Sequence, residues 1–82
     1  MKREEFLKWL ESDSCFSCEW GGDSSWRYEY DYENMIEDYL YVNEENVTLS
    51  FEEWYWGGID YRKRDFTFDE FVEAYKNDSY RC

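Results

Sequence analysis

Hydrophobic residues near the N-terminus recur with a helical period. Phe6, Trp9 and Leu10 stand at i, i+3 and i+4, while charged residues occupy most of the remaining positions of residues 2–12. This spacing places the three side chains on one face of a helix. The sequence therefore predicts an amphipathic helix over residues 2–12, which the polar run after it ends.

A second helical pattern covers residues 68–76, and a capping sequence marks its start. Thr67 precedes the pattern and Glu70 follows three residues later, which is the spacing of a capping box. Phe66 and Phe71 stand at the two positions of a hydrophobic staple, which fixes how the chain enters a helix. We expect the residues that follow this helix, at the end of the chain, to fray.

Between these two segments, apolar and polar residues alternate with a period of two, which is typical of half-buried strands. Residues 15–32 predict a hairpin whose five-residue loop sets Glu19 opposite Arg27. Residues 46–56 and 59–65 predict another hairpin, closed by a two-residue glycine turn of type I′.

Residues 33–40 allow two assignments, a helix or a strand. A strand is favoured because a four-residue loop would pair Val42 with Val47 and Leu40 with Leu49, on one face. We adopt this hairpin and allow a helical turn over residues 33–37. The predicted fold is α+β: an antiparallel β meander of four to five strands, flanked by an N-terminal and a C-terminal helix in a single domain, residues 1–82.

Composition adds a strong negative charge to this picture. Asp and Glu number 21 against nine Lys and Arg, so the formal net charge is −12, and aromatic residues make up 24% of the chain. Disordered acidic chains are poor in aromatic residues, which argues for a folded domain here. A chain of this charge is repelled by nucleic acid and by anionic membrane surfaces, which excludes both as direct partners.

The three cysteines, Cys15, Cys18 and Cys82, do not define a cofactor site. Their odd number argues against a disulfide framework. Zinc would need a fourth ligand, and the chain has no histidine. A thioredoxin-like motif would need a helix N-terminus in a βαβ setting. We expect no metal and no redox role, with one thiol of the Cys15–Cys18 pair buried and the other exposed.

Catalytic motifs are also missing from the sequence. Without histidine, Ser–His and Cys–His pairs cannot form. Gly21-Gly22 and Gly57-Gly58 lack the spacing of a phosphate-binding loop. A chain of 82 residues leaves little room for a water-excluding pocket. We interpret the protein as a non-enzyme without a cofactor.

The acids cluster in one block of the sequence. From Tyr28 to Tyr61 the chain has ten acids and no base. On a strand, alternate acids would follow one another at roughly 6.6–6.8 Å, on the scale of successive phosphates of a nucleic acid strand. We expect this block to bind a basic groove, with the partner-binding residues Glu29, Asp31, Glu33, Glu37, Asp38, Glu44, Glu45, Glu52 and Glu53.

In size, charge, lack of histidine and acidic block, the chain resembles the small acidic proteins that bacteriophages and mobile elements encode against host defences. These include DNA-mimic anti-restriction proteins, uracil-DNA glycosylase inhibitors and anti-CRISPR proteins. The resemblance implies an inhibitor, above all an anti-CRISPR protein, that fills the nucleic-acid-binding site of a basic protein or nucleoprotein complex such as a CRISPR effector. The N-terminus has no signal-peptide pattern, which favours the cytoplasm of the host bacterial cell.

Two other classes of function stay open on the sequence. One is an immunity protein or antitoxin that neutralises a cognate nuclease toxin, which calls on the same charge attraction. The other is a structural adaptor domain in which the aromatic surface dominates.

Overall fold

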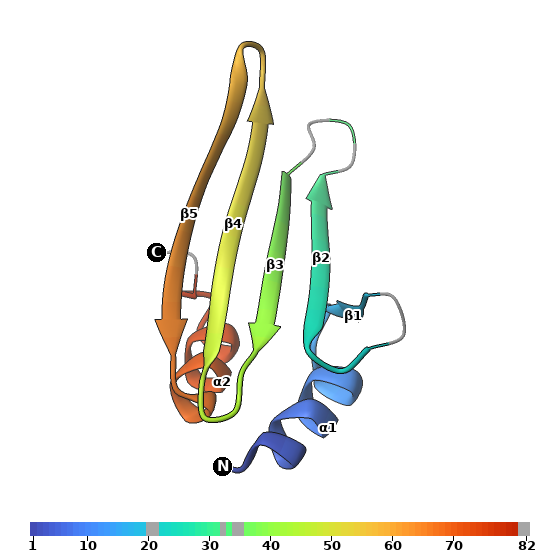
Figure 1. Ribbon diagram of the computed structural model, residues 1–82, viewed down its shortest axis with the longest axis vertical. Helices are drawn as coiled ribbons and strands as arrows, with labels where there is room; N and C mark the ends of the chain where they lie inside the picture. The colour runs from blue at the N-terminus through green and yellow to red at the C-terminus, as the bar shows by residue number, and fades with distance from the viewer. Residues whose placement is uncertain (20–21, 32, 34–35, 81–82) are drawn as a thin grey trace.

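The computed structural model of the protein describes residues 1–19, 22–31, 33 and 36–80. Within them, five strands and two helices follow one another in the order α, five β, α (Figure 1). Every strand pairs with its sequence neighbour in antiparallel orientation, so the predicted meander is confirmed. The elements are α1 (Arg3–Asp13), β1 (Ser17–Cys18), β2 (Ser25–Asp31), β3 (Ile36–Val42), β4 (Val47–Tyr55), β5 (Gly58–Phe66) and α2 (Phe68–Lys76).

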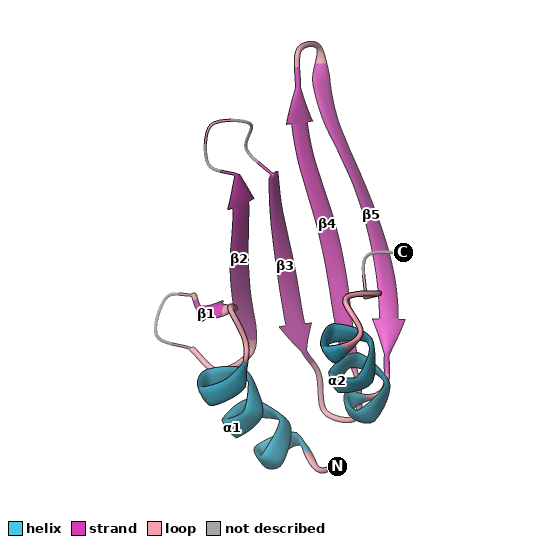
Figure 2. Ribbon diagram, turned by 180° about the vertical axis from the view of Figure 1, so that it is seen from behind, coloured by secondary structure: helices cyan, strands magenta, loops and turns pink. Residues whose placement is uncertain are grey.

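The helices cover one face of the sheet, and only at one end of it. Figure 2 shows α2 in front of the lower part of the sheet and α1 beside it, below β1 and β2. The turn between β4 and β5 lies at the opposite end of the molecule, whose principal extents are 40 × 27 × 20 Å. The other face of the sheet carries no helix, so its side chains are available for contact with a partner.

The core between helices and sheet is built largely from aromatic rings. Phe71 of α2 is 0% exposed and lies at its centre. Its ring centroid is 5.8 Å from that of Phe6 on α1, 6.0 Å from Phe16 and 5.5 Å from Phe66 at the end of β5. The last distance confirms the predicted hydrophobic staple. One α2 residue thereby joins both helices, the sheet and the chain entering β1.

The start of α2 has both hydrogen bonds of the predicted capping box. The Thr67 side chain accepts a hydrogen bond from the backbone N–H of Glu70 at 3.1 Å. The Glu70 carboxylate in turn accepts one from the backbone N–H of Thr67 at 2.9 Å. These bonds satisfy two backbone donors that the first helical turn leaves without partners in the helix.

Residues 78–80 depart from the prediction that residues 78–82 fray, whereas residues 81 and 82 lie outside the described residues. Tyr80 is only 4% exposed, and its ring lies 5.7 Å from Phe71, 5.5 Å from Tyr75 and 6.3 Å from Phe16. Asp78 adopts a positive φ of 58°, which turns the chain after α2. The segment therefore folds back, because burial of the Tyr80 ring contributes more free energy than the tail loses in conformational entropy.

The β3–β4 hairpin is confirmed in its predicted register, with Val42 opposite Val47 and Leu40 opposite Leu49. All four side chains are buried on the face that the helices cover. The competing helical assignment is excluded for residues 36–42, which form β3, whereas residues 34 and 35 lie outside the described residues.

The other two hairpins have registers that differ from the predicted ones by two residues. In the β4–β5 hairpin the two turn residues are Trp56 and Gly57. Among the described glycines only Gly57 has a positive φ, 105°. A type I′ turn needs a positive φ at both central residues, so the predicted turn type is wrong. Glu52 consequently lies opposite Tyr61, whereas the predicted two-glycine turn would set it opposite Lys63. In the first hairpin β1 has only two residues, and Cys18 pairs with Trp26. A shift of two residues keeps each side chain on its predicted face.

Strand β5 forms one edge of the sheet, and three consecutive cations lie on it. Arg62, Lys63 and Arg64 are all exposed. The Arg64 guanidinium lies 4.6 Å from the centre of the Phe66 ring, a cation–π contact. The most basic stretch of the chain is thus confined to the edge opposite β1.

Candidate functional site

Three glutamates lie side by side on the sheet face that carries no helix. The register sets Glu29 of β2 opposite Glu37 of β3, and Glu37 opposite Glu52 of β4. Neighbouring strands are about 4.8 Å apart, so the three residues form a row across the sheet. All three side chains are half-buried. We refer to Glu29, Glu37 and Glu52 as the glutamate row.

The next cross-strand pair on the same sheet face, Arg27 and Tyr39, orients two members of this row. Arg27 lies directly opposite Tyr39 and donates a hydrogen bond to it. The Tyr39 hydroxyl donates to Oε2 of Glu37 at 2.5 Å. The Arg27 Nη2 lies 2.8 Å from Oε1 of Glu29, and its Nε lies 3.0 Å from Oε1 of Glu19. Fixed hydrogen bonds of this kind restrict the positions of the carboxylates before any partner binds.

The electrostatics of this face are strongly negative. Three carboxylates, those of Glu19, Glu29 and Glu37, act on the guanidinium of Arg27. The hydrogen bond with Tyr39, and then the nearby carboxylates, raise the pKa of Arg27, while burial acts in the opposite sense. Burial and the charge of Glu37 raise the pKa of Glu52 above its ordinary value. Glu29 and Glu37 are thus held by hydrogen-bonding partners, whereas Glu52 adds an unfavourable charge beside Glu37.

Tyr39 is a proton donor rather than a titrating group at this face. Burial, followed by the hydrogen bond to Glu37, raises the pKa of Tyr39 to about 12. Its hydroxyl therefore stays protonated at neutral pH and keeps its hydrogen bond to the Glu37 carboxylate. This residue was missed by the sequence analysis, although it shares the alternation of β3 with Glu37.

The nine acids predicted to bind a partner do not form one lattice. A β-bulge between Glu29 and Asp31 sets Asp31 opposite Ile36 and ends the regular alternation in β2. Glu33 is exposed beyond the end of β2. The expectation that alternate acids follow one another along one strand is therefore wrong for Glu29, Asp31 and Glu33. The row runs across three strands instead.

Asp38 does not belong to the exposed surface. It is 0% exposed and lies on the helix-covered face, opposite Tyr28 of β2 and Phe51 of β4. Glu44 and Glu45 are exposed in the turn between β3 and β4, at the end of the sheet where the helices lie (Figure 1). The structure therefore brings together three of the predicted residues, Glu29, Glu37 and Glu52. The side chains of Asp31 and Glu53 lie outside the described residues.

The predicted contact between Glu19 and Arg27 is present although its hairpin register is shifted. Glu19 follows β1, and its carboxylate reaches the Arg27 guanidinium from there. In the described part of the chain, no group of three or more Cys, Asp or Glu side chains is arranged to hold a metal ion. This applies to the glutamate row as well.

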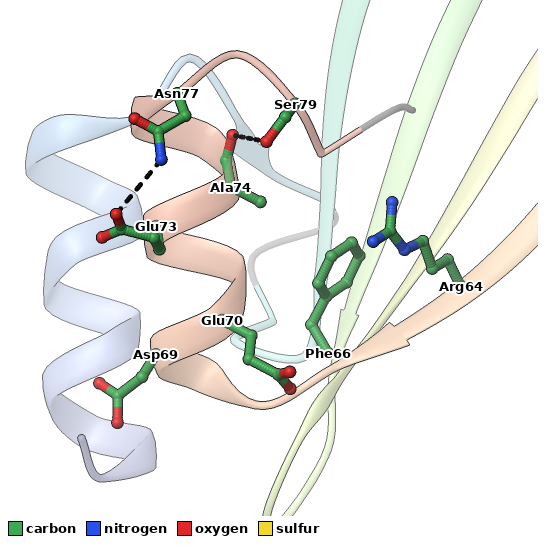
Figure 3. A pocket seen from close by; sticks show the side chains of 8 residues that line it. All are labelled: Arg64, Phe66, Asp69, Glu70, Glu73, Ala74, Asn77 and Ser79. Atoms are coloured by element: carbon green, nitrogen blue, oxygen red, sulfur yellow. Dashed lines mark hydrogen bonds between the residues drawn. The ribbon is translucent and has the colours of Figure 1, made fainter.

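Three hollows of the described chain lie on the helix side of the molecule, one of them, about 430 Å³, between α1 and α2. Another, about 550 Å³, lies between α2 and β5 and is shown in Figure 3. Several of its polar groups bond within this region: Asn77 donates to Glu73 at 3.2 Å and Ser79 to the Ala74 carbonyl at 3.4 Å, while Glu70 belongs to the capping box. These bonds lie at the two ends of α2.

The third hollow, about 620 Å³, lies between α1 and β1 and includes Cys18. Cys15 and Cys18 are both free and exposed, so the expectation that one of them is buried is wrong. The Cys15 backbone N–H donates to the Tyr75 hydroxyl at 2.9 Å, which ties the start of β1 to α2. Cys82 lies outside the described residues.

Comparisons of the chain with protein-family models, with curated proteins and with solved structures found no match. In the part of the chain that the structure describes, no helix has the length and apolar character needed to cross a membrane.

Proposed function

We propose that this protein is a non-enzymatic inhibitor of the DNA-mimic or anti-CRISPR class. It acts in the cytoplasm of a host bacterial cell and occupies the basic nucleic-acid-binding site of a defence complex. The observation that carries this proposal is the glutamate row: three carboxylates on adjacent strands of a sheet face that no helix covers.

The spacing of these charges suits a site built for phosphates. Adjacent strands lie about 4.8 Å apart, so the row presents carboxylates in close succession, as a nucleic acid strand presents its phosphates. A groove whose Lys and Arg side chains bind successive phosphates can therefore meet successive members of the row. The three exposed cations of β5 lie at the sheet edge.

The hydrogen bonds around the row support tight binding as well as attraction. Glu29 is held by Arg27, and Glu37 by Tyr39, before a partner arrives. Side chains that are already ordered lose less conformational entropy on association, which preserves more of the interaction free energy. The net charge of −12 adds long-range attraction to a basic groove and accelerates encounter.

A competition experiment tests this proposal. Fluorescent target DNA is bound to a Cas9–guide RNA complex, a type I restriction endonuclease or uracil-DNA glycosylase, and the protein is titrated in. We expect DNA to be displaced from at least one of these, and added salt to slow association because charge attraction is screened beyond about 8 Å.

A matched pair of variants separates the row from net charge. The double variant Glu37→Gln/Glu52→Gln and the double variant Glu44→Gln/Glu45→Gln each remove two negative charges. We expect the first to lose at least tenfold more affinity than the second. Equal losses would mean that net charge and not the row determines binding, and DNA that stays bound at saturating protein would contradict mimicry.

A further inference from the structure

The tip of the β4–β5 hairpin presents an exposed aromatic side chain. Trp56 is 100% exposed and Ile59, which follows the turn, is 41% exposed. Among the residues whose side-chain burial is described, Met1 and Tyr41 are the other large hydrophobic residues exposed to a similar degree as Ile59. A fully exposed tryptophan at a projecting tip is a feature of protein contact surfaces, where this residue is enriched.

The hairpin carries Trp56 beyond the rest of the sheet. The last pair of β3 with β4 is Ile36 opposite Glu53, whereas β4 and β5 continue through two more pairs to the turn. At about 3.3 Å per residue, the tip extends roughly 7–10 Å past β3. Figure 1 shows this turn at the end of the molecule opposite α1 and α2, so a partner can enclose it.

The turn itself fixes how the indole is presented. Trp56 and Gly57 form a two-residue connection, and Gly57 adopts φ = 105°, which other residues rarely adopt. A short turn between paired strands leaves the tip few alternative conformations. The backbone that carries Trp56 is therefore restricted before binding, and less backbone entropy is lost when the indole becomes buried.

The charge around the tip identifies the chemistry of the partner. From Glu52 to Tyr61 the chain has three acids and no base. An anionic membrane surface and a second copy of this −12 chain are both repelled by such a segment. A matching pocket is apolar inside and basic at its rim.

Pockets of this kind occur where proteins bind unstacked nucleobases. Aromatic side chains stack on the base, and cations beside them bind the backbone phosphates. The indole of Trp56 is a flat, two-ring system of the same general shape as a purine. The glutamate row begins at Glu52, four residues from Trp56 and thus about 13 Å away along β4.

We propose that Trp56 inserts into the base-stacking pocket of the nucleic-acid-binding protein whose phosphate-binding cations face the glutamate row. The protein would then mimic a base as well as the phosphates. This inference rests on the proposed function, and it adds the hairpin tip as a second, apolar point of contact.

The test measures binding of four forms of the protein to the three purified probes named above: uracil-DNA glycosylase, a Cas9–guide RNA complex and a type I restriction endonuclease. The forms are wild type, Trp56→Ala, Trp56→Phe and the control Tyr41→Ala. Tyr41 is 41% exposed and lies in β3 near the helix-covered end, away from the tip. All four are expected to melt at the same temperature, because both altered side chains are exposed.

We expect Trp56→Ala to weaken binding to the recognised probe by about thirtyfold or more, the range of an interface hot spot. The loss should appear as faster dissociation, with an unchanged dependence on salt. Trp56→Phe should retain most of the affinity, since it still stacks, and Tyr41→Ala should change it less than threefold. On binding, the tryptophan emission of the wild type should shift to the blue more than that of Trp56→Phe.

The outcomes separate this inference from the proposed function. If the wild type binds a probe and Trp56→Ala binds it as tightly as Tyr41→Ala does, the Trp56 contact is wrong and the charge mimicry stands. If the wild type binds none of the three probes, both proposals fail. Self-association in sedimentation, or binding to phosphatidylcholine vesicles, that Trp56→Ala abolishes would also overturn the inference, in favour of a second copy or a lipid surface.

Discussion

Glu37 and Glu52 lie directly opposite each other on β3 and β4, with the same charge on the same face of the sheet. Like charges in directly opposed positions destabilise an antiparallel pair. The charge of Glu37 contributes to the raised pKa of Glu52, after burial, and Tyr39 donates its hydroxyl to Glu37. The sheet therefore tolerates an unfavourable pair at a surface position where neutral residues would fit.

Replacing Glu52 by Gln should stabilise the protein at pH 7. The amide keeps the shape of the side chain and removes its repulsion with Glu37. The expected gain in the free energy of unfolding is about 0.2–1 kcal/mol. For a domain of this size that corresponds to a rise of about 1–8 °C in the melting temperature. Glu45→Gln, which removes an exposed turn charge, is the control and should change it less.

The gain from Glu52→Gln should also depend on pH. Because the pKa of Glu52 is higher in the folded protein than its ordinary value of 4.5, ionisation of this group lowers stability as the pH rises through the folded-state pKa. Below pH 4.5 the wild-type side chain is protonated in both states, and the variant should lose its advantage. Melting temperatures of the wild type and the variant, measured at several values between about pH 3.5 and pH 7, check this dependence. A gain that is constant across this range would contradict the role of the charge.

Glu70→Gln should show the opposite dependence on pH. The hydrogen bonds with the backbone and the side chain of Thr67 lower the pKa of Glu70 below 4.5 in the folded protein. Its charge therefore stabilises the fold above pH 4.5, and this contribution is lost as the pH falls through the folded-state pKa. Thermal melts should show Glu70→Gln below wild type at neutral pH, with the two converging in acid. Melts that differ equally at all pH values would mean that the charge is not responsible.

Phe71→Ala should remove a large part of the stability of the domain. The ring is fully buried among Phe6, Phe16 and Phe66, and truncation of a core Phe costs about 3–5 kcal/mol. Urea unfolding monitored by circular dichroism measures the loss. Phe71→Leu should cost less, since it fills more of the space, and a midpoint unchanged in the alanine variant would show that α2 does not dock as described.

Tyr80→Ala should destabilise the protein although the residue is close to the end of the chain. Its ring packs against Phe16, Phe71 and Tyr75, so we expect a loss of about 1–3 kcal/mol in the free energy of unfolding. Ser79→Ala, at an exposed position of the same segment, is the control and should change stability by less than about 0.5 kcal/mol. Equal urea midpoints for the two variants would favour a frayed end.

The parts of the fold that follow from neighbouring residues could be predicted from the sequence. The capping box at Thr67 and the helical spacing of Phe68, Phe71 and Val72 are local signals, and α2 has the predicted bounds. The β3–β4 hairpin was also predictable, because a four-residue loop pairs Val42 with Val47 and Leu40 with Leu49, and all four side chains are buried.

The hairpin registers that were wrong depend on details of turns that residue type does not settle. Gly57-Gly58 permits a type I′ turn, yet the chain turns one residue earlier and uses the positive φ of Gly57 alone. Either register keeps Phe51 on the buried face, so hydrophobic alternation cannot separate them.

The glutamate row could be predicted only in part. The sequence identified its members as acids on strands, but their alignment depends on pairing between β2 and β3 and on the bulge after Glu29. The burial of Asp38 follows from the same alternation that buries Leu40 and Val42, and the emphasis on charge obscured it. The docking of Tyr80 is a tertiary contact with no local signal.

The three exposed cations of β5 have a consequence for solubility at high concentration. An edge strand offers unpaired backbone groups on which a second copy could add and extend the sheet. In an antiparallel addition centred on Lys63, each Lys63 would face its counterpart, and Arg62 would face Arg64. The three cations of one copy would then repel the three cations of the other at the centre of the junction. This edge strand therefore resists the growth of fibres, which the high aromatic content of the chain would otherwise favour.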